Sequence, residues 1–152
     1  MGLSNRTGRV VLTTGNRSEI LTGYCTLYGD TCGGFAPIKD LYKTEVFRLA
    51  RWRNGEGEVI PESIIARPPS AELREGQKDS DSLPPYEVLD ALSAAWLGRG
   101  ATDEELEREF PAETVRKVKR LVFRSEFKRR QGAPGVVLRG GAELPLVHGF
   151  GV

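Results

Sequence analysis

The residues best suited to binding a nucleotide lie in the segment from Thr13 to Asp30. The apolar run at positions 10–12 predicts a short buried strand, which ends at Thr14 and turns into a helix with Glu19 in its first turn. In α/β folds, ligands bind at this end of a sheet. Helix-opening N–H groups favour anions there, and a lone carboxylate beside them can hold a cation. The pattern indicates a nucleotide polyphosphate with magnesium, although many βα turns without a ligand share it.

Three separated stretches carry a more specific signal, and they occur in this order: TTGNRSEILTGYCTLYGDTCGGFAPIKDLYKTEVFRLARW from Thr13, IPESIIARPPSAELREGQKDSDSLPPYEVLD at Ile60–Asp90, and SEFKRRQ at Ser125–Gln131. Together they resemble the synthetase domain of glutamine-dependent NAD synthetases. The opening MGLSNRTGRVV also resembles a stretch of that family just before its fourth strand. The likeness covers most of the chain, roughly Met1 to Gln131.

The resemblance implies a fold and a reaction. The fold is α/β, the Rossmann-like adenine-nucleotide α-hydrolase type, here only its carboxyl-terminal portion, mostly helical with one recognisable strand. Residues 1–131 are expected to form a partial NAD synthetase domain, and residues 132–152 an irregular tail. The implied reaction uses ATP and magnesium to adenylate the carboxylate of deamido-NAD. Ammonia obtained from glutamine then displaces AMP to give NAD.

Matching the family motifs residue by residue implies the binding residues. Thr14, Lys43 and Ser70 correspond to the ATP-binding positions. Glu19 and Lys128 correspond to deamido-NAD-binding positions, and Glu19 is also the expected magnesium ligand; no residue is assigned as catalytic. Each has a simpler structural interpretation, such as a helix-stabilising carboxylate for Glu19 or a solvated helix start for Lys43.

Two positions depart from the ammonia-dependent branch of the family. Phe127 stands where that branch has histidine, and Leu27 stands where it has a substrate-binding lysine. Both departures bear on how the dinucleotide is contacted.

Two family features do not occur in the 152 residues. One is the pyrophosphate-binding loop Ser-Gly-Gly-x-Asp-Ser, and the other is the glutaminase domain with its Cys, Glu and Lys triad. We therefore expect the chain to be inactive alone and to need the amino-terminal portion of the synthetase as a partner. Because the predicted strand would have an unpaired edge, we also expect homo-oligomers.

Composition excludes several other classes. The formal net charge of +1 gives no overall attraction to nucleic acid or membranes, and no apolar run is long enough to span a bilayer. Cys25, Cys32 and the distant His148 do not form a zinc-binding set. Reduced thiols and the lack of a signal peptide favour a cytoplasmic protein.

The spacing of apolar and capping residues predicts the elements that position the site. We expect a helix over Lys43–Asn54, a mobile surface loop over Ala71–Ser82, and a helix capped by Ser82. A capping box at Thr102 and Glu105 predicts another short helix. Pro111 is expected to open the last helix, whose apolar face comprises Val115, Val118, Leu121 and Val122.

The last helix is strongly basic, which leaves an alternative from a different class: a non-catalytic helical module binding RNA or a protein partner. No aromatic platform or nucleic-acid motif supports the RNA version. A second alternative is another ATP pyrophosphatase of the same superfamily. The linked RPPSAEL and SEFKRRQ motifs speak against it.

Overall fold

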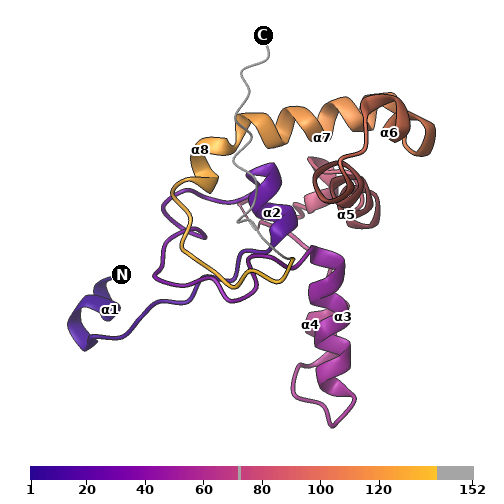
Figure 1. Ribbon diagram of the computed structural model, residues 1–152. Coiled ribbons are helices and arrows are strands. Elements are labelled where there is room, and N and C mark those ends of the chain that lie inside the picture. Colours follow the sequence, from indigo (N-terminus) through magenta and orange to yellow (C-terminus); the bar gives the residue numbers. More distant parts are fainter. Residues whose placement is uncertain (72, 140–152) are drawn as a thin grey trace.

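The computed structural model describes residues 1–71 and 73–139. Its elements, shown along the chain in Figure 1, are α1 (Gly2–Thr7), α2 (Arg17–Thr22), α3 (Lys43–Asn54), α4 (Glu62–Ile65), the 3₁₀ turn η1 (Asp79–Asp81), α5 (Tyr86–Ser93), the π-helical turn η2 (Ala94–Gly98), α6 (Asp103–Glu109), α7 (Ala112–Arg124) and α8 (Glu126–Arg129).

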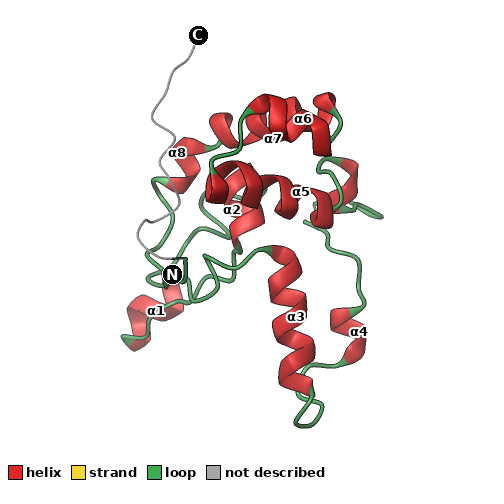
Figure 2. Ribbon diagram, turned by 45° about the vertical axis from the view of Figure 1, so that its right-hand side comes forward, coloured by secondary structure: helices red, strands yellow, loops and turns green. Residues whose placement is uncertain are grey.

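The core is helical and lies where α2, α5, α6 and α7 meet (Figure 2). α7 contributes Val115, Val118 and Val122, whose spacing of three and four residues places them on one face. Leu89 of α5 and Leu21 of α2 are fully buried in the same hydrophobic cluster. α3 and α4 project away from this core, and α1 lies apart from it.

The predicted buried strand at positions 10–12 is wrong. Within residues 1–71 and 73–139 no strand forms, and the segment makes one isolated parallel bridge, from Leu12 to Phe35. Two hydrogen bonds support the pairing: the Thr13 amide donates to the Phe35 carbonyl at 2.9 Å and the Gly34 amide to the Val11 carbonyl at 3.0 Å. A parallel strand becomes buried only between further strands and two covering layers. Here the side chain of Leu12 is 60% exposed.

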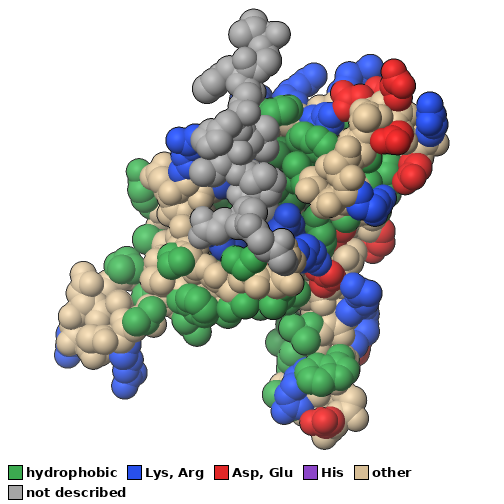
Figure 3. Space-filling view, in the orientation of Figure 1, with side chains coloured by type: hydrophobic (Ala, Val, Ile, Leu, Met, Phe, Trp, Pro, Cys, Tyr) green, Lys and Arg blue, Asp and Glu red, His purple; other side chains and the backbone are tan. Residues whose placement is uncertain are grey.

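We call the surface formed by Val10, Leu12 and Phe35 the edge face. All three side chains are exposed. Figure 3 shows apolar side chains gathered in this region, between α1 and α3.

Two other elements predicted from the sequence agree with the structure. The helix over Lys43–Asn54 and the capping box of Thr102 and Glu105 are both confirmed. The predicted cap at Ser82 is wrong: the helix begins at Tyr86 with Pro85 as its N-cap, because the two prolines keep the preceding chain extended. No helix in the described part of the chain is long and apolar enough to cross a membrane.

The last predicted helix is interrupted at Ser125, which separates α7 from α8. Ser125 is buried, and its hydroxyl donates to the carbonyls of Leu21 at 2.7 Å and Val122 at 3.1 Å. The break therefore joins the end of α7 to the end of α2.

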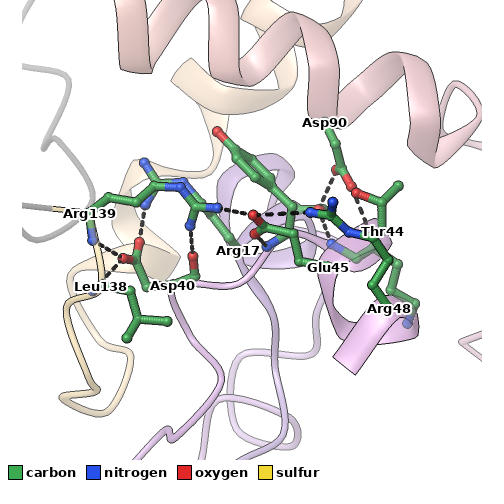
Figure 4. A network of polar contacts seen from close by, with 11 residues as sticks. Arg17, Asp40, Thr44, Glu45, Arg48, Asp90, Leu138 and Arg139 are labelled. Carbon is green, nitrogen blue, oxygen red and sulfur yellow. Dashed lines mark hydrogen bonds and ion pairs between the residues drawn. The ribbon is translucent and has the colours of Figure 1, made fainter. Parts of the chain in front are cut away.

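The first part of the predicted tail packs against the segment just before α3, through Asp40 (Figure 4). The carboxylate of Asp40 accepts the amides of Leu138 at 2.8 Å and Arg139 at 3.1 Å, and it also pairs with the buried Arg17. The guanidinium of Arg139 reaches Glu45 of α3. Residues 132–139 thus form an irregular but anchored segment, whereas the rest of the predicted tail, 140–152, lies outside the described residues.

Candidate functional site

A cavity of about 570 Å³ opens between α2, the start of α3, the loop before η1 and α8. The residues predicted from the sequence to bind ligands all line it: Thr14, Glu19, Lys43, Ser70 and Lys128. They come from segments as far apart as positions 14 and 128. The fold therefore brings together every residue that was predicted to form the site.

α2 begins with a capping box that holds Glu19 in place. The Asn16 side chain accepts the Glu19 amide at 3.1 Å, and one Glu19 carboxylate oxygen accepts the Asn16 amide at 3.1 Å. The sequence pattern Asn-x-x-Glu could have predicted this box. Its consequence is that Glu19 has one carboxylate oxygen engaged by the backbone and the other, Oε1, facing Lys43.

Lys43 and Glu19 form an ion pair of 2.8 Å within the cavity wall, and each side chain is 19% exposed. The Lys43 amide donates to the Ser18 hydroxyl at 2.9 Å, which anchors the start of α3 on α2. The Lys43 ammonium also lies 5.5 Å from the centre of the Tyr86 ring. The pair places a positive charge and a hard carboxylate oxygen side by side at the cavity.

Lys128 lies at the opposite end of α2. Its ammonium donates to the carbonyls of Gly23 at 2.8 Å and Cys25 at 2.6 Å, which is favourable because a helix carboxyl end carries partial negative charge. An ammonium has three N–H donors, so one remains for a ligand in the cavity. The thiol of Cys25 also lines the cavity, and burial raises its pKa.

Arg129 was not identified from the sequence, yet it fixes the position of Lys128. Its guanidinium is buried and donates to the Leu21 carbonyl at 2.8 Å and the Val122 carbonyl at 2.7 Å. Burial lowers the pKa of Arg129. These bonds tie α8 to the ends of both α2 and α7.

Gly23 permits this close approach. It adopts φ +67°, and a Cβ at this position would lie 2.3 Å from the Ser125 Cβ. A glycine ending a helix is a common signal, but its contact with Ser125 is invisible in the sequence.

Asp79 also lines the cavity and was missed, because the segment 71–82 was predicted to be a mobile surface loop. Its side chain is buried, and the Tyr86 hydroxyl donates to its Oδ2 at 2.6 Å. Burial and the neighbouring negative charges of Asp79 and Glu19 raise the pKa of Tyr86. The Asp79 amide donates to the Pro69 carbonyl at 3.0 Å, so the intervening loop, which includes Ser70, closes on itself at the cavity.

The donor set suits magnesium only when a ligand supplies further oxygens. In residues 1–71 and 73–139 no group of three or more His, Cys, Asp or Glu side chains could hold a metal ion. Magnesium commonly takes one or two carboxylates and completes its shell with water and phosphate oxygens. Glu19 could supply such a carboxylate, provided that the cation shares Oε1 with Lys43 or displaces it.

The chain is similar to known proteins over most of its length. A family model described as NAD synthase matches residues 1–132. The glutamine-dependent NAD(+) synthetase of Acinetobacter baylyi is 52% identical and aligns with 99% of this chain and 29% of its own length. The Thermotoga maritima synthetase is also 52% identical and aligns with 99% of this chain and 27% of its own length. The chain thus spans less than a third of these two curated relatives.

Solved structures give the same result. NMN synthetase from Francisella tularensis superposes with a TM-score of 0.67 at 26% identity, over 84% of this chain and 47% of that chain. A glutamine-dependent NAD(+) synthetase from Cytophaga hutchinsonii gives 0.66 at 27% identity, over 88% of this chain and 22% of that chain. The predicted fold class, a Rossmann-like adenine-nucleotide α-hydrolase fold of which this chain carries a mostly helical portion, is confirmed.

Proposed function

This chain belongs to the NAD synthase family, and we propose that it supplies the carboxyl-terminal part of the site at which deamido-NAD is amidated to NAD. The observation that carries the proposal is the convergence of Thr14, Glu19, Lys43, Ser70 and Lys128 on one cavity. Family motifs that are far apart in the sequence point to the same place in the structure. A solvated basic module has no reason to gather them.

In this proposal the ATP phosphates lie against Lys43, with hydrogen bonds from Thr14 and Ser70. Lys43 is a compact point charge whose ammonium is held over Tyr86, so it can follow the negative charge that builds on the leaving pyrophosphate. Bound magnesium would neutralise part of the same charge, with Glu19 as its protein ligand.

The dinucleotide lies between Glu19 and Lys128 in this proposal. The free N–H of the Lys128 ammonium suits an anionic or carbonyl oxygen, because its other two donors hold the end of α2. The helix between the two residues is locked at both ends, by the capping box and by Ser125 and Arg129. That rigidity fixes the span that a bound ligand must match.

We further propose that the 152-residue chain does not synthesise NAD alone. The Ser-Gly-Gly-x-Asp-Ser motif, which forms the family's pyrophosphate-binding loop, does not occur in the 152 residues, and adenylation depends on such positioned contacts. Residues 1–131 would act with an amino-terminal portion of the synthetase, which supplies that loop and ammonia from glutamine. Assembly into homo-oligomers belongs to the same proposal.

A chimera tests the function. This chain would replace the matching segment of the Acinetobacter baylyi synthetase, and formation of NAD and AMP from deamido-NAD, ATP and glutamine would be measured in single turnovers. We expect the chimera to be active and the isolated chain to be inactive. An inactive but folded chimera, or an isolated chain that makes NAD at a comparable rate, contradicts the proposal.

Two variants of the chimera test the roles. Glu19→Ala should lower the rate about 100-fold, because it removes a charged ligand contact of roughly 3 kcal/mol. Ser70→Ala should lower it about fivefold, since a single neutral hydrogen bond contributes about 1 kcal/mol net. Glu19→Gln is the matched control, because it retains a carbonyl oxygen for the helix cap and removes only the charge. Equal losses for Glu19→Ala and Ser70→Ala would show that the roles are misassigned.

A further inference from the structure

The carboxylate of Asp79 is buried at the cavity, and only one of its two oxygens has a hydrogen-bond partner among the described residues. Asp79 is 5% exposed and lines the cavity. Its Oδ2 accepts the Tyr86 hydroxyl, whereas Oδ1 has no hydrogen-bond partner among the described residues. A buried carboxylate oxygen without a donor is costly, so its persistence at a ligand cavity calls for a functional reason.

The surrounding contacts fix Asp79 firmly. Its amide is bonded to the Pro69 carbonyl, and its own carbonyl accepts the amides of Ser82 at 3.0 Å and Leu83 at 2.9 Å. Tyr86, which orients the carboxylate, is itself buried at the start of α5. These contacts hold Asp79 in place at the cavity, beside the Tyr24 hydroxyl, whose pKa is raised by burial and by Asp79.

The chemistry of the free oxygen selects its partner. A carboxylate oxygen accepts hydrogen bonds or binds cations. Among residues 1–71 and 73–139 no group of three or more His, Cys, Asp or Glu side chains could hold a metal ion, so Asp79 does not belong to a metal-binding cluster. A single carboxylate oxygen is sufficient to accept a hydroxyl donor. Sugar hydroxyls are the donors that buried acidic residues accept in other dinucleotide sites.

We propose that Asp79 is a further ligand-binding residue of this cavity, whose Oδ1 accepts a hydrogen bond from a ribose hydroxyl of the bound dinucleotide. Tyr86 is its positioning residue. The assignment rests on the proposed function, because deamido-NAD is the ligand that brings ribose hydroxyls into the cavity.

Binding of deamido-NAD measured by isothermal titration calorimetry tests the assignment. Asp79→Asn should weaken binding by about 10- to 100-fold, the range for a hydrogen bond to a charged group. Asp81→Asn is the matched control: Asp81 lies in the same turn, but its side chain is 41% exposed and pairs with Arg74. It should leave the affinity unchanged. Tyr86→Phe keeps the ring under Lys43 and should weaken binding several-fold.

Titrations with a series of ligands distinguish a direct contact between Asp79 and the ligand from a merely structural role of Asp79. Two deamido-NAD analogues, each lacking both hydroxyls of one ribose, would be titrated into the wild-type chain. One analogue should bind about 10- to 100-fold more weakly than deamido-NAD, and Asp79→Asn should weaken that analogue no further. This comparison stands even if Asp79→Asn folds poorly, because the loss with the analogue is measured on the wild-type chain.

Three results would overturn the assignment. Equal affinity of Asp79→Asn, Asp81→Asn and wild type excludes the contact and leaves the proposed function intact. Full affinity for both analogues, with an Asp79→Asn loss that appears only when magnesium is present, would make Asp79 a cation ligand. A wild-type chain that binds no dinucleotide contradicts the site itself, and the assignment with it.

Discussion

The helical core and the edge face are both apolar in sequence, yet they end in opposite environments. Leu21, Leu89 and Val118 are 0% exposed in the core, whereas Val10 and Leu12 on the edge face are 69% and 60% exposed. The helices satisfy their backbone hydrogen bonds internally and need only one apolar stripe covered. The extended segment at 10–12 needs neighbouring strands for its amides and layers for its side chains. Within residues 1–71 and 73–139, the helices therefore bury their apolar faces against one another, whereas the extended segment at 10–12 makes one isolated bridge and stays exposed.

Three of the five candidate site residues lie in the helical part of the described chain. Glu19, Lys43 and Lys128 lie on helices that pack on or beside the core, and hydrogen bonds and an ion pair hold their side chains in place. In the edge face, by contrast, an isolated bridge and its flanking bonds join Leu12 to Phe35, and the adjacent Ala36 bridges to Gly135. We expect the two regions to respond very differently to substitution.

The largest difference should appear when a leucine is shortened in each region. Leu89→Ala should lower the free energy of unfolding by about 3 kcal/mol, because it opens a cavity at a fully buried position. Leu12→Ala should change it by less than about 0.5 kcal/mol, since most of that side chain already contacts solvent. Urea denaturation followed by circular dichroism measures both. Similar losses would mean that the edge face is as well packed as the core.

Association should reveal the edge face directly. An unpaired, apolar extended edge recruits other chains, so the sedimentation coefficient of the wild-type chain should rise with concentration. Replacing Val10 and Leu12 by lysine should abolish that rise without lowering the thermal midpoint. Leu3→Lys, on the exposed helix α1, is the control and should leave association unchanged. A wild-type chain that stays monomeric at all concentrations would remove the basis for this contrast.

The smallest expected effect is on the pH dependence of stability. It arises from Asp90 of α5, whose carboxylate accepts hydrogen bonds from Ser18 and Thr44 next to the site. Burial raises the pKa of Asp90, although hydrogen bonds from Ser18 and Thr44 oppose the shift. The folded protein therefore retains this proton at higher pH than the unfolded chain does. The associated stability is fully present below the unfolded pKa of about 3.9 and is lost as pH rises through the folded pKa.

Asp90→Asn should flatten that decline in stability with rising pH. Denaturation curves measured across the acidic range would show it, with Glu104→Gln on the exposed face of α6 as the control. An unchanged slope for Asp90→Asn would mean that the carboxylate titrates alike in both states.

The sequence predicted the helices more accurately than the extended segments, and the reason is the range of the interactions. The bounds of α3 and the cap of α6 depend on residues within four positions of each other. The burial of positions 10–12 depends on neighbouring strands on both sides, and residues 1–71 and 73–139 provide only the bridge to Phe35. The break at Ser125 depends on a hydrogen bond to Leu21, more than a hundred positions away.

For the site, motif matching alone identified five residues that line one cavity, but it did not identify how they are held. Asp79 lies in a polar, glycine-containing stretch that is typical of a surface loop, and its hydrogen bonds with Tyr86 and Pro69 become visible only in the folded chain. Arg129 lay within a run of basic residues that resembles a solvated face. Its burial between two helix ends could not be anticipated from its neighbours.

By itself, the sequence determined the family, the types of residue offered to a nucleotide and most of the helices, because these depend on residue identity and short-range spacing. Three features of the site depend on the tertiary structure. Glu19 and Lys43 form an ion pair, and the Lys128 ammonium donates two hydrogen bonds to carbonyls at the end of α2. One carboxylate oxygen of Asp79 has no hydrogen-bond partner among the described residues. Those outcomes depend on which distant groups become neighbours after packing. Burial then sets how strongly the assembled charges interact, since it removes the water that would otherwise screen them.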